Sequence, residues 1–235
     1  MTSPSSSAHR SNPSASEPNA PRSAANNFAV QRHSTEKAHS LQGVLLYLKQ
    51  YLRAPTQIGA VAPSSDQLAE RMLETIDFTK AKVISEFGPG PGGVTAVLLR
   101  KLQPQTTFFA IEANPQMCVA FRKRFPSITL FEGSAAEVGT FAATAGQPKE
   151  GCLDAIVSGL PWAAFTAELQ HSILTAAVKA LRPGGQFVTF AYSAGVYLPA
   201  GKRFAAALPR YFSSITRSRG VWLNIPPAFV YRCVK

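Results

Sequence analysis

The stretch Val83-Ile-Ser-Glu-Phe-Gly-Pro-Gly-Pro-Gly-Gly93 decides the fold of this chain. Its first residues are apolar and β-branched, which predicts a short buried strand. Four glycines follow, at positions 88, 90, 92 and 93, and the segment after them, 94–102, has helical spacing. A strand, a glycine-rich turn and a helix in this order open a nucleotide-binding α/β unit. Glycines suit the turn because a ligand must approach the main chain closely and some turn residues need a positive φ.

Two classes of ligand compete for this turn. The glycines satisfy G-x-G-x-x-G, the dinucleotide fingerprint, but so dense a run of glycines satisfies many patterns. Glu86 favours another ligand, because a carboxylate repels a pyrophosphate and accepts an ammonium group or its water. Phe108–Glu112 predicts a second strand, and it ends in an acid roughly 20 residues beyond the first glycine, where a ribose-hydroxyl acceptor is usual. Glu86, Gly88, Gly90 and Glu112 together resemble the cofactor site of the class I S-adenosylmethionine (SAM)-dependent methyltransferases. The alternative is a structural turn with surface acids.

The length and composition predict three parts. Residues 1–35 are rich in Ser, Ala, Pro and Asn and cannot bury enough apolar surface to fold alone. We interpret them as a disordered tail, either passive or a loose electrostatic tether. Residues 36–54 are expected to form an amphipathic, membrane-associating helix, and residues 55–235 suit one α/β domain with no room for a second.

The charge of the chain is unevenly distributed. The formal net charge is +11, yet the last acid is Glu168, and nine Lys or Arg follow it. Such a one-signed region predicts a polyanionic partner, either nucleic acid or an anionic lipid surface. General basicity of the source proteome is the alternative.

The three cysteines are isolated, with no C-x-x-C motif and no disulfide framework. We expect reduced thiols in a cytoplasmic protein and no metal. No apolar run reaches the length of a membrane span, and the N-terminus lacks the apolar core of a signal peptide.

The first periodic segment is basic and amphipathic. Its apolar stripe has helical spacing, lysines and arginines flank it, and Pro55 predicts its end near Arg53. Such a helix with Tyr47 and Tyr51 can lie in a lipid interface. The alternative is an ordinary helix packed on the domain.

The next segment, Thr56–Ser65, is small and polar and contains a proline. It precedes the first strand, so we interpret it as a lid over the cofactor. The alternative is capping, in which Ser64 or Ser65 starts a helix over Asp66–Ile76.

The rest of the chain alternates strand and helix patterns. We expect helices at 115–125 and 168–180, a loop at 142–151 and a turn at 181–185. Further strands are expected at 128–131, 153–157, 186–192, 212–221 and 227–234. The prediction is a single Rossmann-like, seven-stranded α/β sheet with helices on both faces.

Ser134 follows the third predicted strand. In many methyltransferases an Asp at this position bonds the adenine amino group, whereas this chain has a hydroxyl. Recognition of adenine must then depend on backbone groups.

Ser158-Gly-Leu-Pro-Trp162 follows a central strand, at the edge where α/β sheets place their chemistry. In DNA and RNA amino methyltransferases an Asn occupies the position of Gly159. Without that carboxamide, Leu160-Pro-Trp162 offers a carbonyl acceptor and an aromatic face, which suits an aliphatic amine. Such an amine has a pKa of ~10.4 in water, and desolvation must lower it before attack. As methyls accumulate, the aromatic faces of Trp162 and Tyr192 are candidates to bind the quaternary ammonium. Alternatively, Trp162 is a core residue and Tyr192 an ordinary tyrosine at a strand end.

Several motifs together resemble the bacterial phospholipid N-methyltransferases of the PmtA type, over residues 40 to 235. They are Ile58-Gly-Ala-Val-Ala-Pro-Ser-Ser65, Glu86-Phe-Gly-Pro-Gly90, Ser158-Gly-Leu-Pro-Trp162, Phe190-Ala-Tyr192 and Asn224-Ile-Pro-Pro-Ala-Phe-Val-Tyr231.

The resemblance implies stepwise methylation of phosphatidylethanolamine to phosphatidylcholine, with S-adenosylhomocysteine as the second product. It also implies a peripheral enzyme at the inner face of the cell membrane. We further expect an anionic phospholipid surface as partner, no nucleic acid, and a monomer. The substrate site is expected at Ser158, Gly159, Leu160, Pro161, Trp162 and Tyr192. The cofactor is expected at Gly59, Ala60, Ser64, Glu86, Gly88, Gly90, Glu112, Ala113, Ser134, Ala135 and Ser158.

Two other functions stay open at this point. An rRNA adenine N6-dimethyltransferase-like enzyme is favoured by basicity but lacks the Asn and a C-terminal RNA-binding domain. A catalytically silent protein that binds SAM or lipid is the second alternative.

Overall fold

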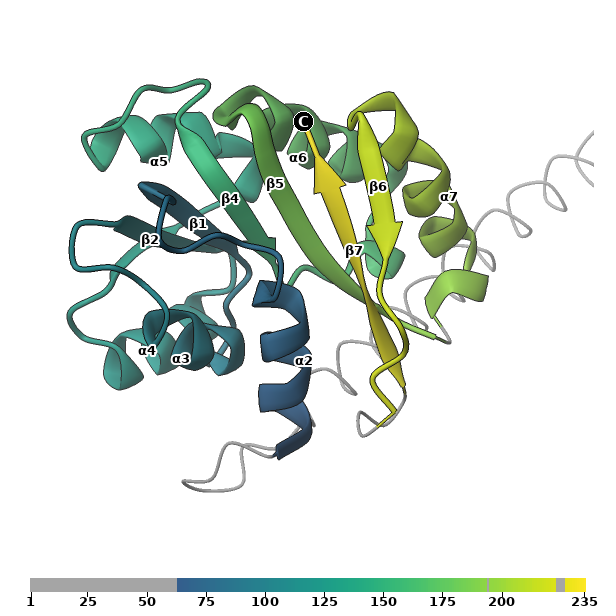
Figure 1. Ribbon diagram of the computed structural model, residues 1–235, viewed down its shortest axis with the longest axis horizontal. Coiled ribbons are helices and arrows are strands. Elements are labelled where there is room, and N and C mark those ends of the chain that lie inside the picture. The colour runs from purple at the N-terminus through teal and green to yellow at the C-terminus, as the bar shows by residue number, and fades with distance from the viewer. Residues whose placement is uncertain (1–62, 194, 223–226) are drawn as a thin grey trace, which may run out of the picture. The chain divides into compact units, whose positions relative to one another are not determined.

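The computed structural model describes residues 63–193, 195–222 and 227–235. Its strands form one seven-stranded sheet in the order β3-β2-β1-β4-β5-β7-β6, as Figure 1 shows. All pairs are parallel except those made by β7, which runs antiparallel to β5 and β6. The strands are β1 Val83–Phe87, β2 Thr107–Glu112, β3 Thr129–Glu132, β4 Leu153–Ser158, β5 Leu181–Tyr192, β6 Ser214–Arg217 and β7 Ala228–Val234.

Burial follows the position of each strand in the sheet. Every residue of β1 is buried, because this central parallel strand is covered on both faces. The edge strands β3 and β6 keep partly exposed residues. The carboxyl ends of β1, β2 and β4 therefore meet at the middle of one sheet edge, where the predicted site lies.

Helices cover both faces of the sheet (Figure 1). On one face, α2 (Pro63–Leu73) and α3 (Gly93–Leu99) bury apolar side chains with Ile84 and Val157. On the other face, α5 (Val138–Thr144), α6 (Ala167–Ala180) and α7 (Pro199–Ala207) bury theirs with Phe87 and Phe187. α4 (Pro115–Arg124) packs along β2 and β3. This confirms the predicted Rossmann-like architecture.

Some predicted boundaries were wrong. Helix α5 begins at Val138, so the loop expected at 142–151 starts inside a helix. β5 begins at Leu181, so the turn expected at 181–185 lies inside this strand, where its register with β4 shifts between Leu153 and Ala155. Helix α7 was not predicted, although Pro199 stands at its first position, where proline is common; Gly201 in its first turn weakens the helical pattern.

The tail 1–35, the amphipathic helix 36–54 and most of the lid 56–65 lie outside the described residues. Helix α2 begins at Pro63, so Ser64 and Ser65 lie in its first turn rather than ahead of it as caps. Across the described ranges, no helix combines the length and apolar character that crossing a bilayer requires.

Candidate active site

The glycine turn joins β1 to α3 and is closed against β2. The Gly88 N–H donates to the Ile111 carbonyl at 2.8 Å, and Gly88 and Gly90 have φ angles of 65° and 55°. A Cβ on Gly90 would meet no atom within 4 Å, whereas a Cβ on Gly88 would lie 2.7 Å from the Leu160 Cδ2. The two glycines therefore have different roles. The absence of a side chain at Gly90 leaves open space beside the turn, and its absence at Gly88 lets the loop after β4 pack closely on the turn.

Gly92 has a packing role in this structure. It is the N-cap of α3 with a φ of 83°, and a Cβ there would lie 2.1 Å from the Phe125 ring. The Arg124 guanidinium donates to the Pro91 carbonyl at 3.0 Å. The end of α4 thus supports the turn from behind.

Glu86 lies behind the turn and is 1% exposed. Its carboxylate accepts a hydrogen bond of 2.7 Å from the Thr95 hydroxyl of α3, and Thr95 is itself buried. Burial raises the pKa of Glu86 to about 7; the Thr95 hydrogen bond opposes this shift and the nearby Glu112 charge adds to it. A cation placed beside Glu86 would restore its charge.

Glu112 ends β2 on the other side of the turn. Its two carboxylate oxygens accept from the Gly90 N–H at 3.1 Å and the Asn114 N–H at 2.9 Å. The half-buried side chain therefore holds the turn and β2 together. Ala113, the next residue, is exposed.

These residues fit SAM on two observations. Gly90 combines a positive φ with open space for a close-lying ligand, and two acids flank the turn without a cationic partner in the described part of the chain. An ammonium and ribose hydroxyls suit such a surface, and a pyrophosphate does not. Glu86, Gly88, Gly90 and Glu112 would hold the group, which supplies an electrophilic methyl on a sulfonium.

Ser134 caps the short helix Ala135–Glu137. Its hydroxyl accepts from the Ala136 N–H at 3.2 Å, and Glu137 accepts in return from the Ser134 N–H at 3.1 Å. The sequence signal for this capping box, Ser-x-x-Glu, was missed. Ala135 is buried in the core, so its backbone rather than its side chain could face adenine. Gly59 and Ala60 lie outside the described residues.

The loop after β4 is tied to β1 and β5. The Gly159 N–H donates to the Phe87 carbonyl at 2.8 Å, and the Thr189 hydroxyl donates to the Ser158 carbonyl at 3.0 Å. The indole N–H of Trp162 is shared between Thr189 at 3.0 Å and Ser158 at 3.2 Å. The Ser158 hydroxyl is buried in this network.

Trp162 is a core residue, the alternative that the sequence left open. It is 4% exposed and stacks on Phe204 with ring centroids 4.5 Å apart, while Phe165 and Phe187 meet it edge-on. We expected Trp162 to offer a free ring face to an ammonium group. This is wrong for the ring face that stacks on Phe204. The indole instead fixes the position of the loop.

A buried amide links this loop to α7. The Gln170 side chain of α6 donates to the Trp162 carbonyl at 2.7 Å and to the Ala200 carbonyl at 3.0 Å. Its amide oxygen accepts from Arg203 at 3.3 Å. Neither Gln170 nor Arg203 was singled out from the sequence, although an amide on the apolar side of a helix is a recognisable signal.

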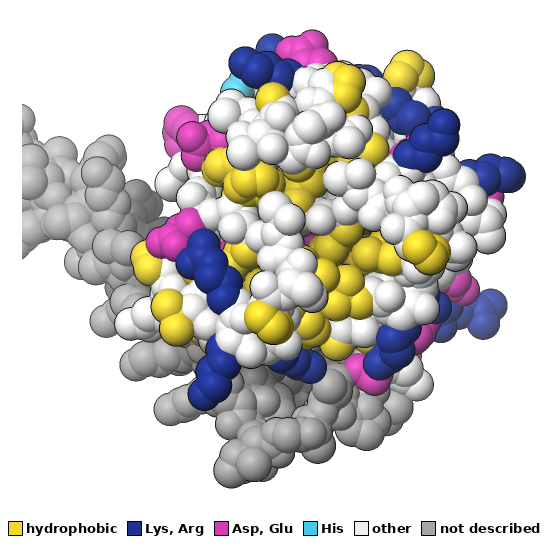
Figure 2. Space-filling view, turned by 90° about the vertical axis from the view of Figure 1, so that its left-hand side faces the viewer, with side chains coloured by type: hydrophobic (Ala, Val, Ile, Leu, Met, Phe, Trp, Pro, Cys, Tyr) yellow, Lys and Arg dark blue, Asp and Glu magenta, His cyan; other side chains and the backbone are white. Residues whose placement is uncertain are grey.

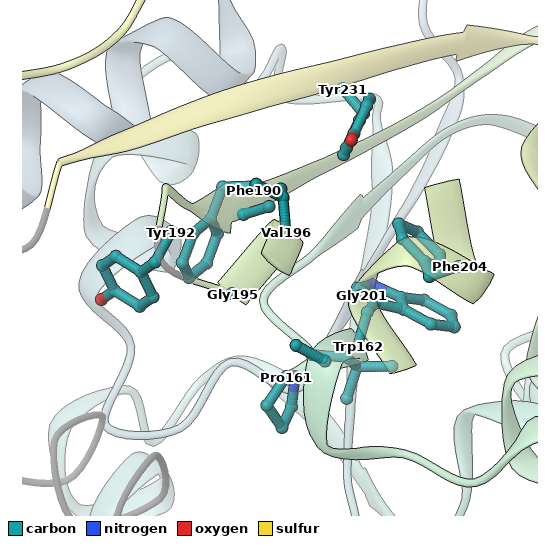
Figure 3. A pocket seen from close by; sticks show the side chains of 12 residues that line it. Pro161, Trp162, Phe190, Tyr192, Gly195, Val196, Gly201, Phe204 and Tyr231 are labelled. Atoms are coloured by element: carbon teal, nitrogen blue, oxygen red, sulfur yellow. The ribbon is translucent and has the colours of Figure 1, made fainter. Parts of the chain in front are cut away.

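A pocket opens beside the loop, between the ends of β4 and β5 and the start of α7 (Figure 3). Tyr192 and Phe190 form one side, Trp162 and Phe204 lie across from them, and Tyr231 closes it from β7. The remaining lining residues are small or apolar: Leu160, Pro161, Ala163, Ala191, Gly195, Val196 and Gly201. Of the predicted substrate residues, Leu160, Pro161, Trp162 and Tyr192 meet at this pocket.

The two tyrosines are the ionisable groups of the pocket wall. Burial raises the pKa of both Tyr192 and Tyr231, so both hydroxyls are neutral near pH 7. A wall of this kind would lower the pKa of an amine that it desolvated, and aromatic rings can bind methylated ammonium groups. Phe190, Phe204 and Tyr231 were missed as pocket residues, because only the tertiary fold brings β5, α7 and β7 together.

Residues 84–185 match the family model described as a methyltransferase domain. The match covers somewhat less than half of the chain and includes both the glycine turn and the loop after β4. Together with the fold, it supports a class I methyltransferase with SAM as the cofactor.

A protein relative adds to this. The chain is 27% identical to the ornithine lipid N-methyltransferase of Singulisphaera acidiphila, over 82% of this chain and 96% of that protein.

Solved structures show the same fold. The O-methyltransferase from Bacillus cereus in complex with SAH is 15% identical, with a TM-score of 0.56 over 84% of this chain and 91% of that one. The O-methyltransferase TomG from Streptomyces achromogenes, in complex with SAM, is 18% identical, with a TM-score of 0.54 over 83% and 89%. Within the described residues, no group of three or more His, Cys, Asp or Glu is arranged to hold a metal ion.

Proposed function

We propose that this protein transfers methyl groups from SAM to the primary amine of phosphatidylethanolamine and then to its mono- and dimethyl forms, giving phosphatidylcholine. One observation carries the proposal: the apolar, tyrosine-lined pocket shares Leu160 with the glycine turn, where Leu160 packs against Gly88. A donor on the turn and an amine in the pocket would then be neighbours. The lipid N-methyltransferase relative supports a lipid amine as acceptor.

The residues of the chain act mainly by positioning and desolvation. The Leu160 and Pro161 wall excludes water from the amine, which favours its unprotonated, nucleophilic form. The Ser158–Trp162–Thr189 network fixes the loop that lines the pocket, and a fixed loop would orient a bound amine. Tyr192 and Tyr231 offer aromatic surface that tolerates the growing number of methyls.

An ornithine lipid is the second candidate substrate, because it is the substrate named for the relative. It too presents an aliphatic amine at a lipid surface. The pocket contains no carboxylate or cation among its lining residues that would select between the two head groups.

A direct assay tests the proposal. The full chain is incubated with methyl-labelled SAM and vesicles of phosphatidylethanolamine, vesicles of ornithine lipid, or total RNA, and the products are separated by chromatography. We expect label in mono-, di- and trimethylated phosphatidylethanolamine. Label confined to ornithine lipid establishes the second candidate, label in RNA establishes an RNA methyltransferase, and SAM binding without any product establishes a silent binding protein.

A further inference from the structure

Three large apolar side chains stand exposed close to the pocket. Tyr197 is 77% exposed, Leu198 41% and Trp222 78%. Tyr197 and Leu198 join the short helix Gly195–Tyr197 to α7, and Trp222 follows Val221 near the start of β7. We call these three residues the docking rim.

The docking rim lies beside two walls of the pocket. Val196, next to Tyr197, lines the pocket directly. On the other side, Tyr192 pairs with Ala228 in the sheet, and Ala228 pairs in turn with Val221, the neighbour of Trp222. Segments that are distant in sequence therefore present apolar side chains at the same edge of the sheet as the pocket.

A tightly packed corner carries the first two rim residues. A Cβ on Gly201 would lie 2.1 Å from the Gly195 carbonyl oxygen, so α7 packs directly on the preceding short helix. The Leu198 N–H donates to Gly195 at 3.2 Å, and the Lys202 N–H donates to Leu198 at 2.9 Å. Tyr197 and Leu198 are therefore held outward by backbone packing.

Basic side chains predominate on the segments that carry the docking rim, although Glu168 lies near Arg203. Lys202 and Arg203 follow the docking rim in α7 and are exposed, as are Arg217 and Arg219 ahead of Trp222. No acid occurs anywhere after Glu168. By contrast, the face shown in Figure 2 carries Lys and Arg side chains beside Asp and Glu.

We propose that the docking rim inserts into an anionic phospholipid surface and so sets the pocket at the level of the lipid head groups. Tyr and Trp prefer the boundary between water and hydrocarbon, and Lys and Arg around them attract anionic head groups. The inference rests on the proposed lipid substrate, and it names the surface through which that substrate is reached.

The two tryptophans of the chain allow a direct test. Trp162 is buried and Trp222 is exposed, so a change in emission on adding lipid reports Trp222. With vesicles of phosphatidylglycerol and phosphatidylethanolamine we expect a blue shift, and quenching when the acyl chains are brominated. Trp222→Phe is expected to lose both signals. Unchanged emission of wild-type protein that floats with the vesicles would overturn the inference; this is the result if residues 1–62 or a second copy cover the rim.

Flotation gives an independent measurement. The triple variant Tyr197→Ser, Leu198→Ser, Trp222→Ser is expected to partition at least roughly tenfold less into the same vesicles, because the lost apolar area no longer enters the interface. Val119→Ser is the matched control, since Val119 is 67% exposed on α4, away from the rim. Equal partitioning of both variants with wild type contradicts the inference.

The proposed function and the proposed docking surface can be disproved independently of each other. Methyl transfer to a soluble, short-chain phosphatidylethanolamine is expected to be the same in the triple variant and in wild type. Loss of that activity in the triple variant would make the rim part of the pocket and overturn its assignment as a docking surface. Wild-type protein that docks through Trp222 but methylates no lipid would disprove the proposed function and leave the docking rim intact.

Discussion

Gly88 and Leu160 are packed so closely that a single added Cβ on the glycine would lie 2.7 Å from the leucine Cδ2. Gly88 belongs to the turn after β1 and Leu160 to the loop after β4, and Leu160 also lines the pocket. If the donor lies on the turn and the acceptor in the pocket, as we propose, this contact would set the separation between them.

Leu160→Ala is expected to slow methyl transfer between roughly ten- and a hundredfold, because a small misplacement of reacting groups is costly. Affinity for SAM should change far less, since the turn itself is untouched. Single-turnover transfer and calorimetry with SAM separate the two effects. Leu169→Ala, at a partly exposed leucine of α6, is the control and should alter neither. An equal loss of SAM affinity in Leu160→Ala would show that Leu160 supports the turn instead.

Gly90→Ala is expected to abolish SAM binding at a modest cost in stability. Its φ of 55° costs an alanine about 1–2 kcal/mol, and no protein atom obstructs the new methyl. Gly146→Ala is a matched control, because Gly146 has a φ of 77° and open space as well. Both variants should lose similar unfolding free energy, and calorimetry should show lost SAM binding in Gly90→Ala alone. Normal SAM affinity in Gly90→Ala would place the cofactor elsewhere.

Glu86→Gln is expected to stabilise the free protein at alkaline pH and to weaken SAM binding. The pKa of Glu86 rises from 4.5 to about 7 on folding, so the native state holds a proton that the unfolded state releases. The unfolding free energy of wild-type protein therefore falls by roughly 3 kcal/mol as the pH rises from about 4.5 to 7, because the unfolded state ionises first. The difference in melting temperature between the variant and wild type should grow over that range and level off above it.

Glu86→Gln removes the ionisable group but keeps an acceptor for the Thr95 hydroxyl. A difference in stability between variant and wild type therefore reports the charge and not the loss of this hydrogen bond. A stability difference that does not vary with pH would mean that Glu86 is ionised in the free protein. Unchanged SAM affinity would remove Glu86 from the cofactor site.

Trp162→Phe is expected to lower the unfolding free energy by about 1–3 kcal/mol. The substitution keeps an aromatic ring against Phe204 but leaves the buried Ser158 and Thr189 hydroxyls without the indole donor. Denaturant unfolding measures the loss, and Trp222→Phe, at an exposed tryptophan, should change it by less than about 0.5 kcal/mol. If Trp162→Phe and wild type have the same unfolding free energy, the hydrogen bonds of Trp162 to Ser158 and Thr189 do not stabilise the fold.

Most of the sheet could be predicted because its strands carry local signals. The β-branched run of β1 and the acid at the end of β2 mark both the elements and the edge where they meet. Helix α7 gave a weaker signal, since Gly201 disfavours a helix by propensity, and close packing of Gly201 on Gly195 is a tertiary contact that the sequence does not show.

The candidate site was only partly predictable, for a similar reason. The sequence identifies Glu86 and Gly90 by their spacing. It cannot show that the Thr95 hydroxyl donates a hydrogen bond to Glu86, or that Phe204 stacks on the ring of Trp162. Both depend on contacts between elements. Residue type alone made Trp162 an attractive ligand for an ammonium, and burial gave it another role.

The buried pair of Glu86 and Thr95 has a consequence for how long the protein lasts in a cell. Near neutral pH an ionised carboxylate in the interior lowers stability even with the Thr95 hydrogen bond, and a cation bound beside it would offset that loss. Molecules deprived of the methyl donor would then open more often and be degraded sooner than saturated ones. Abundance of the enzyme would follow the supply of its own donor, without any dedicated regulator.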